Sequence, residues 1–335
     1  MAVRVHRSRP DPDILLALGP RWDTLADIAG ASFFQRWTWL GALATERYPD
    51  PVLIEATEDG QTLGLAIGNR AGWPPVLHLA STGDVVWDSV FIEHNGPVVM
   101  PGRPDVMRAM LAAMRPVLLP GVGDAVMAAL HSLGGRAIQT RPAPYRDLHD
   151  AGAVSRNTRQ ALARSARAYG QVTLTAAATP AEAREWFAEM VALHTATWNA
   201  RGKPGAFTEP SILRLHHALI DRGVSAGTVD MLRVASGEGL IGILYTFIQG
   251  GTAYAYQSGF DYAGAHGAQK PGLSSHAAAI AHYAKRGMDR YDFLAGESQY
   301  KRSLSSGVEA LHWARLRPAW DPRAWRPSRQ RDVSG

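Results

Sequence analysis

The sequence predicts a mixed α/β (α+β) protein, with a mostly antiparallel sheet flanked by helices, and it indicates that part of this arrangement is duplicated. Apolar residues recur at helical spacing over 12–28, which predicts a helix. Three runs with strand character follow one another within 229–260 around glycine-containing turns, which predicts an antiparallel meander. The stretch 52–66 resembles 231–244, which indicates a duplicated domain.

The two similar stretches read VLIEATEDGQTLGLA and MLRVASGEGLIGIL. Each has a strand, an acidic residue with glycine in the turn, and a second strand that contains a glycine. In the simplest alignment Gly60 matches Gly239, and Gly64 matches Gly242 after a shift of one residue. We therefore expect residues 51–69 and 229–248 to form equivalent hairpins.

Composition indicates a soluble, cytoplasmic protein. The chain has 335 residues, enough for two domains, with 46% hydrophobic and 19% charged residues. It has no cysteine, which excludes disulfides and thiolate catalysis. The N-terminal residues lack the apolar core of a signal peptide, and the longest apolar run, near 240–248, is too short to span a bilayer. The histidines lack metal-ligand spacing with carboxylates, so no metal is expected.

The charge of the chain is basic, with a net charge of +5 and a pI near 9.6. This is consistent with a polyanionic partner such as tRNA, with a phosphorylated cofactor, or with compositional bias. Within 155–169 a helical wheel places Arg156, Arg159, Arg164 and Arg167 on one face. That face is either a solvated surface or a phosphate-binding wall.

A long helix is predicted after Thr179-Pro180-Ala181-Glu182, which is a helix-capping signature. The helix runs to Trp198, and His194 lies on its apolar stripe, where a histidine is more often a core residue than a catalyst. The loop 199–207 that follows contains Gly, Pro, Arg, Lys and Phe, a composition that suits either a ligand loop or a simple connection.

The densest polar cluster lies in 290–302, RYDFLAGESQYKR. Asp292 lies inside an apolar run that predicts a buried strand, so its carboxylate needs a partner or a shifted pKa. Glu297, Tyr300 and Lys301 follow Gly296 at the carboxyl end of that strand, where ligand clefts of α/β sheets lie. The alternative is a strand, a turn and a solvated surface helix.

Four segments of the second half resemble one branch of a known superfamily. They are HTATWNARGKPGAF (194–207), YQSGFD (256–261), KPG (270–272) and YDFLAGESQYK (291–301). Together they resemble the CelD/BcsL-type GNAT acyltransferases, which are related to the FemAB aminoacyltransferases. The resemblance implies tandem GNAT-like domains: a degenerate one in residues 1–150, an acyltransferase domain in 151–317, and an irregular tail in 318–335.

The resemblance also implies where an acyl donor binds. Its amide arm would pair with the strand at 252–260, and its phosphates would meet the start of the following helix. The residues implied for the donor are Gln269, Lys270, Gly272, Ser274 and Ser275, with Arg156 and Arg159. Pro271 removes one N–H from this helix start, so coenzyme A, carrier-protein thioesters and aminoacyl-tRNA all remain open as donors.

For catalysis we predict Asp292 or Glu297 as the base, Tyr300 as the proton donor and Lys301 as a clamp. Asp292 could instead be a structural carboxylate, and Tyr300 a core residue. The residues predicted to bind substrate are His194, Trp198, Arg201, Phe207, Tyr256 and Gln257. We expect the four catalytic residues to face one cavity, opposite Trp198, Arg201 and Tyr256.

These residues and the resemblance are consistent with three functions. The first is acyl transfer from acyl-CoA, or another acyl thioester such as acyl-carrier protein, to an amine or hydroxyl of a small-molecule acceptor. The second is FemAB-type aminoacyl transfer from aminoacyl-tRNA. The third is a non-catalytic GNAT scaffold. The sequence leaves the acceptor and the oligomeric state open.

Overall fold

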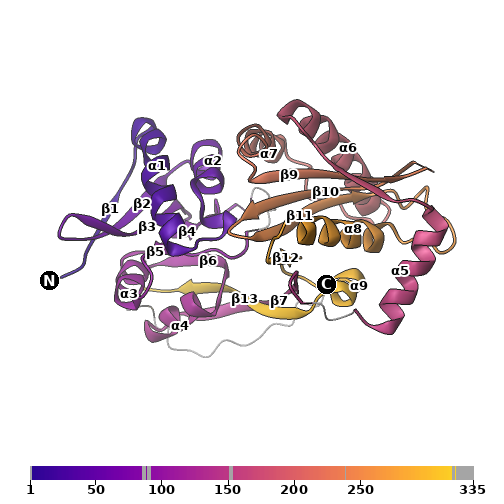
Figure 1. Cartoon of the computed structure of the whole chain (residues 1–335). Coiled ribbons are helices and arrows are strands. Elements are labelled where there is room, and N and C mark those ends of the chain that lie inside the picture. The colour runs from indigo at the N-terminus through magenta and orange to yellow at the C-terminus, as the bar shows by residue number, and fades with distance from the viewer. Residues whose placement is uncertain are drawn as a thin grey trace. The chain divides into compact units, whose positions relative to one another are not determined.

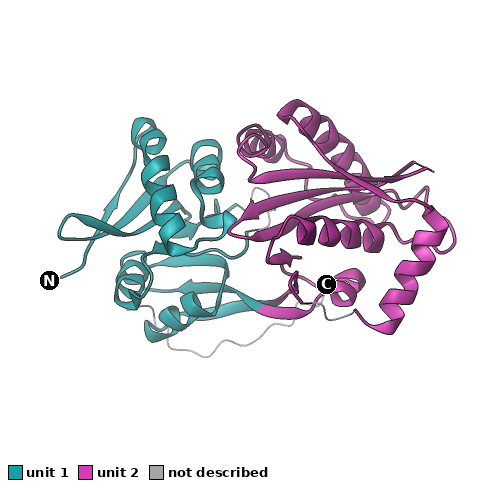
Figure 2. Cartoon of the chain, viewed as in Figure 1, with its two compact units in different colours: residues 1–141, 310–335 teal, residues 142–309 magenta. Residues whose placement is uncertain are grey.

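The computed structural model describes residues 2–84, 88, 92–150, 154–237, 239–318 and 321. The chain forms two compact units, one of residues 1–141 with 310–335 and one of residues 142–309 (Figure 2). The expected domains of 1–150 and 151–317 differ from these units at both ends. The reason is that the division falls inside two long strands, β7 (Arg136–Asp147) and β13 (Gly307–Leu316).

The first unit is a sheet in the order β1-β2-β3-β4-β6-β13, with β5 also paired to β3. All its described strand pairs are antiparallel except the parallel pair of β4 and β6. Besides parts of β7 and β13, its elements are β1 (Arg4–Ser8), α1 (Pro12–Ala29), the 3-10 helix η1 (Phe33–Gln35), α2 (Trp37–Arg47), β2 (Pro51–Glu58), β3 (Gln61–Ala71), β4 (Val76–Leu79), β5 (Val98–Val99), α3 (Pro104–Ala113), β6 (Val117–Val122) and α4 (Asp124–Ser132).

The second unit has a sheet in the order β8-β9-β10-β11-β12-β7, in which β11 and β12 are parallel and the other pairs are antiparallel. Besides the rest of β7 and β13, its elements are α5 (Arg156–Tyr169), β8 (Thr173–Ala176), α6 (Pro180–Asn199), α7 (Pro210–Gly223), β9 (Val229–Ser236), β10 (Gly239–Gln249), β11 (Thr252–Phe260), α8 (Pro271–Lys285), β12 (Arg290–Asp292) and α9 (Gln299–Leu304).

Helices cover both faces of each sheet. In the second unit α6 and α7 lie on one face of β9–β11 and α8 lies on the other (Figure 1). The α8 face buries a core that includes Leu244, Tyr283 and Tyr291. The α6–α7 face buries a cluster of aromatic rings that pack edge to face or tilted, among them Phe187, His216 and Tyr245. The predicted fold class, a mostly antiparallel mixed sheet flanked by helices, is therefore confirmed.

The two expected hairpins are β2–β3 and β9–β10, and they share their irregularities. In the first, Thr57 pairs with Thr62 and Ala56 with Gly64, so Leu63 is bulged. In the second, Ala235 pairs with Leu240 and Val234 with Gly242, so Ile241 is bulged. β3 and β10 also show the same succession of exposed and buried positions. This equivalence, with the same strand order in each unit, supports duplication.

The register corrects one detail of the expected alignment. The bulges align Gly64 with Gly242, as expected, but they align Gly239 with Gln61 and Ala235 with Thr57. The match of Gly60 with Gly239 is therefore wrong by one residue. Gly60 belongs instead to the turn, where Asp59 and Gly60 have φ of 51° and 80°, the left-handed pair that a tight hairpin requires.

The capping signature before α6 is confirmed. The Thr179 hydroxyl accepts a hydrogen bond from the Glu182 N–H at 3.2 Å, and the Glu182 carboxylate accepts one from the Ala178 N–H at 2.8 Å. Pro180 occupies the first turn, where its missing N–H costs nothing. These contacts fix the start of the helix that carries His194 and Trp198.

Candidate active site

The main feature of the second unit is a split between two parallel strands. β11 and β12 pair only over Thr252–Tyr254 and Arg290–Asp292. β11 then continues to Phe260, paired on its other side with β10. Within the described chain no strand pairs with the rest of the β11 edge that faces away from β10, so this edge is open.

The ladder shows which main-chain groups lie on that open edge. The Asp261 N–H donates to the Ile241 carbonyl at 3.1 Å. Because hydrogen-bonded pairs alternate in an antiparallel ladder, Gly259 and Gln257 direct their main-chain groups to β10. The main-chain groups of Ser258 and Phe260 consequently point to the open edge. The Phe260 carbonyl accepts from the Tyr262 N–H and the Ser258 carbonyl lies 3.3 Å from His194 Nδ1, so an extended ligand can pair with the two N–H groups.

His194 is tied to this edge. Its Nδ1 lies 3.3 Å from the Ser258 carbonyl oxygen, and its Nε2 accepts a hydrogen bond from the Ala206 N–H at 3.2 Å. Nδ1 is thus the protonated nitrogen of a neutral ring, and burial lowers the pKa of His194. This histidine connects the loop after α6 to β11, which is a positioning role.

The start of α8 lies beside the split and offers few free amides. The Lys270 N–H donates to the Ser165 hydroxyl of α5 at 2.9 Å, and Pro271 has no N–H. The Ser274 N–H bonds to the Lys270 carbonyl. Helix geometry leaves the N–H groups of Gly272 and Leu273 for a ligand.

The other residues predicted for the donor lie around this helix start. Gln269 donates to the Ala168 carbonyl of α5 at 3.3 Å. Ser274 bonds to Ser165 at 2.9 Å, and Ser275 is buried. α5 therefore brings a serine to this point, whereas its exposed Arg156 and Arg159 lie at its other end.

Tyr300 lies on the α8 side of the split. Its ring stacks on His276 of α8, with centroids 4.4 Å apart. Burial, with a smaller contribution from Tyr262 and against a hydrogen bond with Ser298, raises the pKa of Tyr300 to about 12. The phenol is therefore protonated at neutral pH, as a proton donor must be.

Asp292 and Lys301 both hold the loop after β12. Asp292 is fully buried, and its two oxygens accept hydrogen bonds from the Arg290 guanidinium at 2.9 Å and the Leu294 N–H at 2.8 Å. Leu294 has a φ of 62°, an uncommon conformation that this contact supports. The Lys301 Nζ donates to the carbonyls of Leu294 and Ala295, at 3.1 and 2.9 Å.

The four predicted catalytic side chains do not converge on one cavity. Glu297 is 61% exposed and pairs with Arg302 at 3.2 Å, while Tyr300 points to the core and Asp292 and Lys301 point to the loop. The expectation that these four residues lie opposite Tyr256 is also wrong. Tyr256 packs against His216 of α7, with ring centroids 5.4 Å apart, on the other face of the sheet.

The remaining predicted substrate residues divide into two groups. Phe207 is buried against Phe187 of α6, with centroids 5.5 Å apart, and Gln257 is half-buried on β11. Trp198 lies at the end of α6, where the guanidinium of the exposed Arg201 is 5.6 Å from its ring centroid. Phe207 is thus a core residue, while Trp198 and Arg201 are accessible.

Tyr262 is a residue that sequence reasoning missed. A Cβ at position 272 would lie 3.2 Å from the Tyr262 hydroxyl, so Tyr262 covers the start of α8. Burial raises its pKa, and Arg201 opposes that shift. Tyr262 also affects Tyr300 electrostatically. It therefore lies near Gly272, Arg201 and Tyr300, two residues after Phe260, the last strand residue of the open edge.

In the first unit the equivalent split is filled by the chain itself. β4 and β6 pair in parallel at Leu77–His78, and beyond that point Asn95 pairs with Val122 of β6. The Asn95 amide donates to the Leu79 carbonyl of β4 at 3.3 Å and to the Pro120 carbonyl of β6 at 3.2 Å. Among the described residues, Asn95 thus occupies the gap between β4 and β6 of the first unit, whereas no described strand fills the gap beside β11 in the second.

The described part of the chain contains no group of three or more His, Asp or Glu side chains that could hold a metal ion. Among the same residues no helix is long and apolar enough to cross a membrane.

Residues 153–302 match the family model of the Acetyltransferase (GNAT) domain. This part of the chain is similar to that acetyltransferase domain, and it contains the open split, the start of α8 and Tyr300. Among curated proteins no sequence matches the chain significantly.

Several solved structures share the fold over nearly the whole chain. FemX has a TM-score of 0.61 at 10% identity, over 92% of this chain and 95% of FemX. L-PGS from Bacillus licheniformis has a TM-score of 0.58 at 14% identity, over 94% and 95% of the two chains. The C-terminal domain of a putative lysylphosphatidylglycerol synthetase from Agrobacterium fabrum has a TM-score of 0.55 at 12% identity, over 90% and 92%. At these identities the likeness shows the fold alone.

Proposed function

We propose that the second unit transfers an acyl group from a thioester, carried by coenzyme A or by acyl-carrier protein, to an amine or hydroxyl of a small molecule, sugar or amino acid. The observation that carries this proposal is the open edge of β11 at Ser258 and Phe260, beside the α8 start and Tyr300. An amide-containing donor arm would pair with this edge, and its phosphates would meet the amides of Gly272 and Leu273 near Lys270. The four quoted sequence segments support a CelD/BcsL-type enzyme.

The reaction we propose is a single displacement at the thioester carbonyl. The acceptor nitrogen or oxygen attacks the carbonyl carbon, the carbon–sulfur bond breaks, and the departing thiolate takes a proton from Tyr300. The acceptor's proton goes to a carboxylate. Glu297 suits this base role better than Asp292, because Asp292 is buried and both its oxygens already accept hydrogen bonds. In this proposal Asp292 and Lys301 position the loop between β12 and α9.

A second candidate is aminoacyl transfer from aminoacyl-tRNA, which the net charge of +5 favours. The exposed arginines of α5 are available to phosphates in either case. The melting temperature would discriminate between donors: the cognate one among coenzyme A, acyl-carrier protein and charged tRNA should raise it, because a ligand that binds the folded state stabilises it.

A proline substitution tests the open edge directly. Ser258→Pro removes the N–H that points away from β10, and proline is tolerated at such edge positions. Ser258→Ala is the matched control, because it removes the hydroxyl and keeps the N–H. We expect donor binding and transfer to fall in the proline variant alone. Equal donor affinity in the two variants would rule out main-chain pairing at this edge, and transfer with none of the three donors would refute the proposed function.

A further inference from the structure

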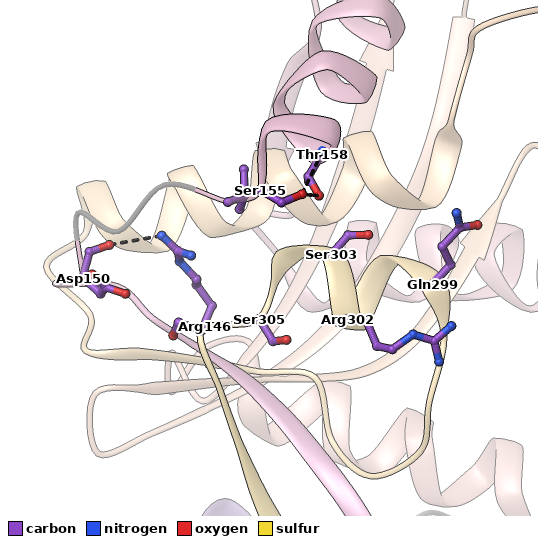
Figure 3. Close-up of a pocket in the computed structure, with 10 residues that line it drawn as sticks. Arg146, Asp150, Ser155, Thr158, Gln299, Arg302, Ser303 and Ser305 are labelled. Atoms are coloured by element: carbon purple, nitrogen blue, oxygen red, sulfur yellow. Dashed lines mark hydrogen bonds between the residues drawn. The ribbon is translucent and has the colours of Figure 1, made fainter.

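A polar cavity of about 460 Å³ lies elsewhere in the second unit (Figure 3). It is bounded by the end of β7, the start of α5, and α9 with the residues that follow it. Its lining residues are Arg146, Asp150, Val154, Ser155, Thr158, Gln299, Arg302, Ser303, Ser305 and Ser306. Only one of these side chains, Val154, is apolar, so the cavity is unsuited to an apolar ligand.

Three polar side chains of this wall are available to a ligand. Among the described residues, Gln299, Ser303 and Ser305 have no hydrogen-bond partner for their side chains. By contrast, Ser155 and Thr158 bond to each other at 2.9 Å. The available groups lie at or just after α9, whereas Tyr300 and Leu304 of the same helix pack in the core.

The charge of the lining is predominantly positive. Arg146, near the end of β7, donates to the Asp150 main-chain carbonyl at 3.1 Å, so its guanidinium points toward Asp150 (Figure 3). Arg302 lies on α9, and its only described ion pair is the exposed one with Glu297. Among the described lining residues, Asp150 is the single carboxylate. Arginine forks together with serine hydroxyls match the oxygens of a phosphate group.

We propose that this cavity binds the phosphate group of a small molecule, with Arg302, Ser303 and Ser305 as its donors and Arg146 on the opposite wall. Its volume lies in the range of small-molecule sites, larger than a bare phosphate needs. It is separate from the α8 start, where the proposed acyl donor places its phosphates, and it does not depend on acyl transfer. The phosphate belongs either to a nucleotide or to a phosphorylated sugar or metabolite.

Calorimetric binding on the full chain tests this assignment. The probes are pyrophosphate, adenosine bisphosphate and a sugar phosphate. The last two show whether the bound phosphate belongs to a nucleotide or to a phosphorylated sugar. The test variant is Ser303→Ala with Ser305→Ala, which removes two hydroxyls and no charge; Arg302→Gln removes the cation. The control is Arg222→Gln, an exposed arginine of α7.

We expect at least one probe to bind, and its affinity to fall about tenfold in the double serine variant and at least as far in Arg302→Gln. Arg222→Gln should bind like the unmodified chain. Affinities unchanged in both cavity variants would overturn the assignment, as would the absence of binding by all three probes. A loss seen in Lys270→Gln but not in the cavity variants would place the phosphate at α8 and would also overturn it. Acyl transfer is not measured, so this outcome and that of the proposed function remain distinct.

Discussion

The imidazole of His276 lies almost parallel to the phenol ring of Tyr300, with ring centroids 4.4 Å apart and 12° between the planes. The His276 Nδ1 is 2.8 Å from the Tyr291 hydroxyl, so the position of the imidazole is fixed by β12. The stack in turn restricts the Tyr300 ring, although His276 makes no hydrogen bond to its hydroxyl. His276 is thus a positioning residue for the proposed proton donor.

The first prediction concerns the Tyr300 hydroxyl. Tyr300→Phe keeps the ring and its stack, so we expect an unchanged melting temperature. Loss of a general acid typically lowers the rate by about 10²–10⁴-fold with little effect on donor binding. Steady-state kinetics with the donor found by thermal shift would check this. A variant with the rate of the unmodified enzyme would make Tyr300 a packing residue only.

The second prediction concerns the acid stability of the fold. Burial, followed by the charge of Lys301, lowers the pKa of His276 to about 3. The unfolded chain, with a histidine pKa of about 6.5, therefore binds more protons than the folded one between these values. The free energy of unfolding should fall as the pH drops from about 6.5 to about 3, by a few kcal/mol at most from this group.

Urea denaturation across this pH range would measure the effect. His276→Gln should flatten the profile, while a residual slope from His194, whose pKa is also lowered, should remain. The exposed His131→Gln serves as control. A slope as steep in His276→Gln as in the unmodified chain would show that this imidazole is not a buried neutral group.

The third prediction separates the two carboxylates. Asp292→Asn leaves Arg290 without its buried partner, so we expect a loss of about 3 kcal/mol in stability. Glu297→Gln removes an exposed ion pair and should change stability by less than about 1 kcal/mol. If Glu297 is the base, its variant instead loses rate. Denaturation and kinetics on both variants measure stability and rate. If Asp292→Asn loses rate and keeps its stability while Glu297→Gln keeps its rate, Asp292 is the base.

The fourth prediction concerns Asn95 in the first unit. Asn95→Ala removes both amide donors, to Leu79 and Pro120, and leaves two carbonyls unpaired. We expect a loss of about 2–3 kcal/mol. Asn157→Ala, an exposed position on α5, should cost much less. Titration of each variant with the acyl donor, followed by calorimetry, should still show one donor bound per chain. Two donors bound per chain would contradict a single open split.

Regular elements and the duplication could be predicted from sequence, because local signals determine them. Helical spacing, the Thr179 cap and the turn at Asp59-Gly60 each depend on residues close in the chain. The bulges at Leu63 and Ile241 could not be predicted, because pairing register depends on contacts across the sheet. The alignment of Gly60 with Gly239 therefore failed by one residue.

The candidate site was harder to predict than the fold. The sequence indicated that Asp292 needs a partner, and Arg290 supplies it two positions away. It gave no means of knowing that Tyr256 and Tyr300 lie on opposite faces of the sheet, since a bulge at Tyr256 changes the alternation along β11. Tyr262 was missed because it follows the strand and forms part of no motif. Its position over Gly272 is a tertiary contact.

The pairing of β13 with β6 has a consequence for how the protein is made. Residues 310–316 leave the ribosome after every residue of the second unit, yet they cover an edge of the first. Until then β6 offers an unpaired strand edge, the kind of surface that recruits other chains into aggregates. The nascent polypeptide thus finishes its second unit before its first, the reverse of the usual N-terminal-first order. A chain that ends just before residue 310 would therefore keep its second unit whole, and it would expose the β6 edge of its N-terminal unit.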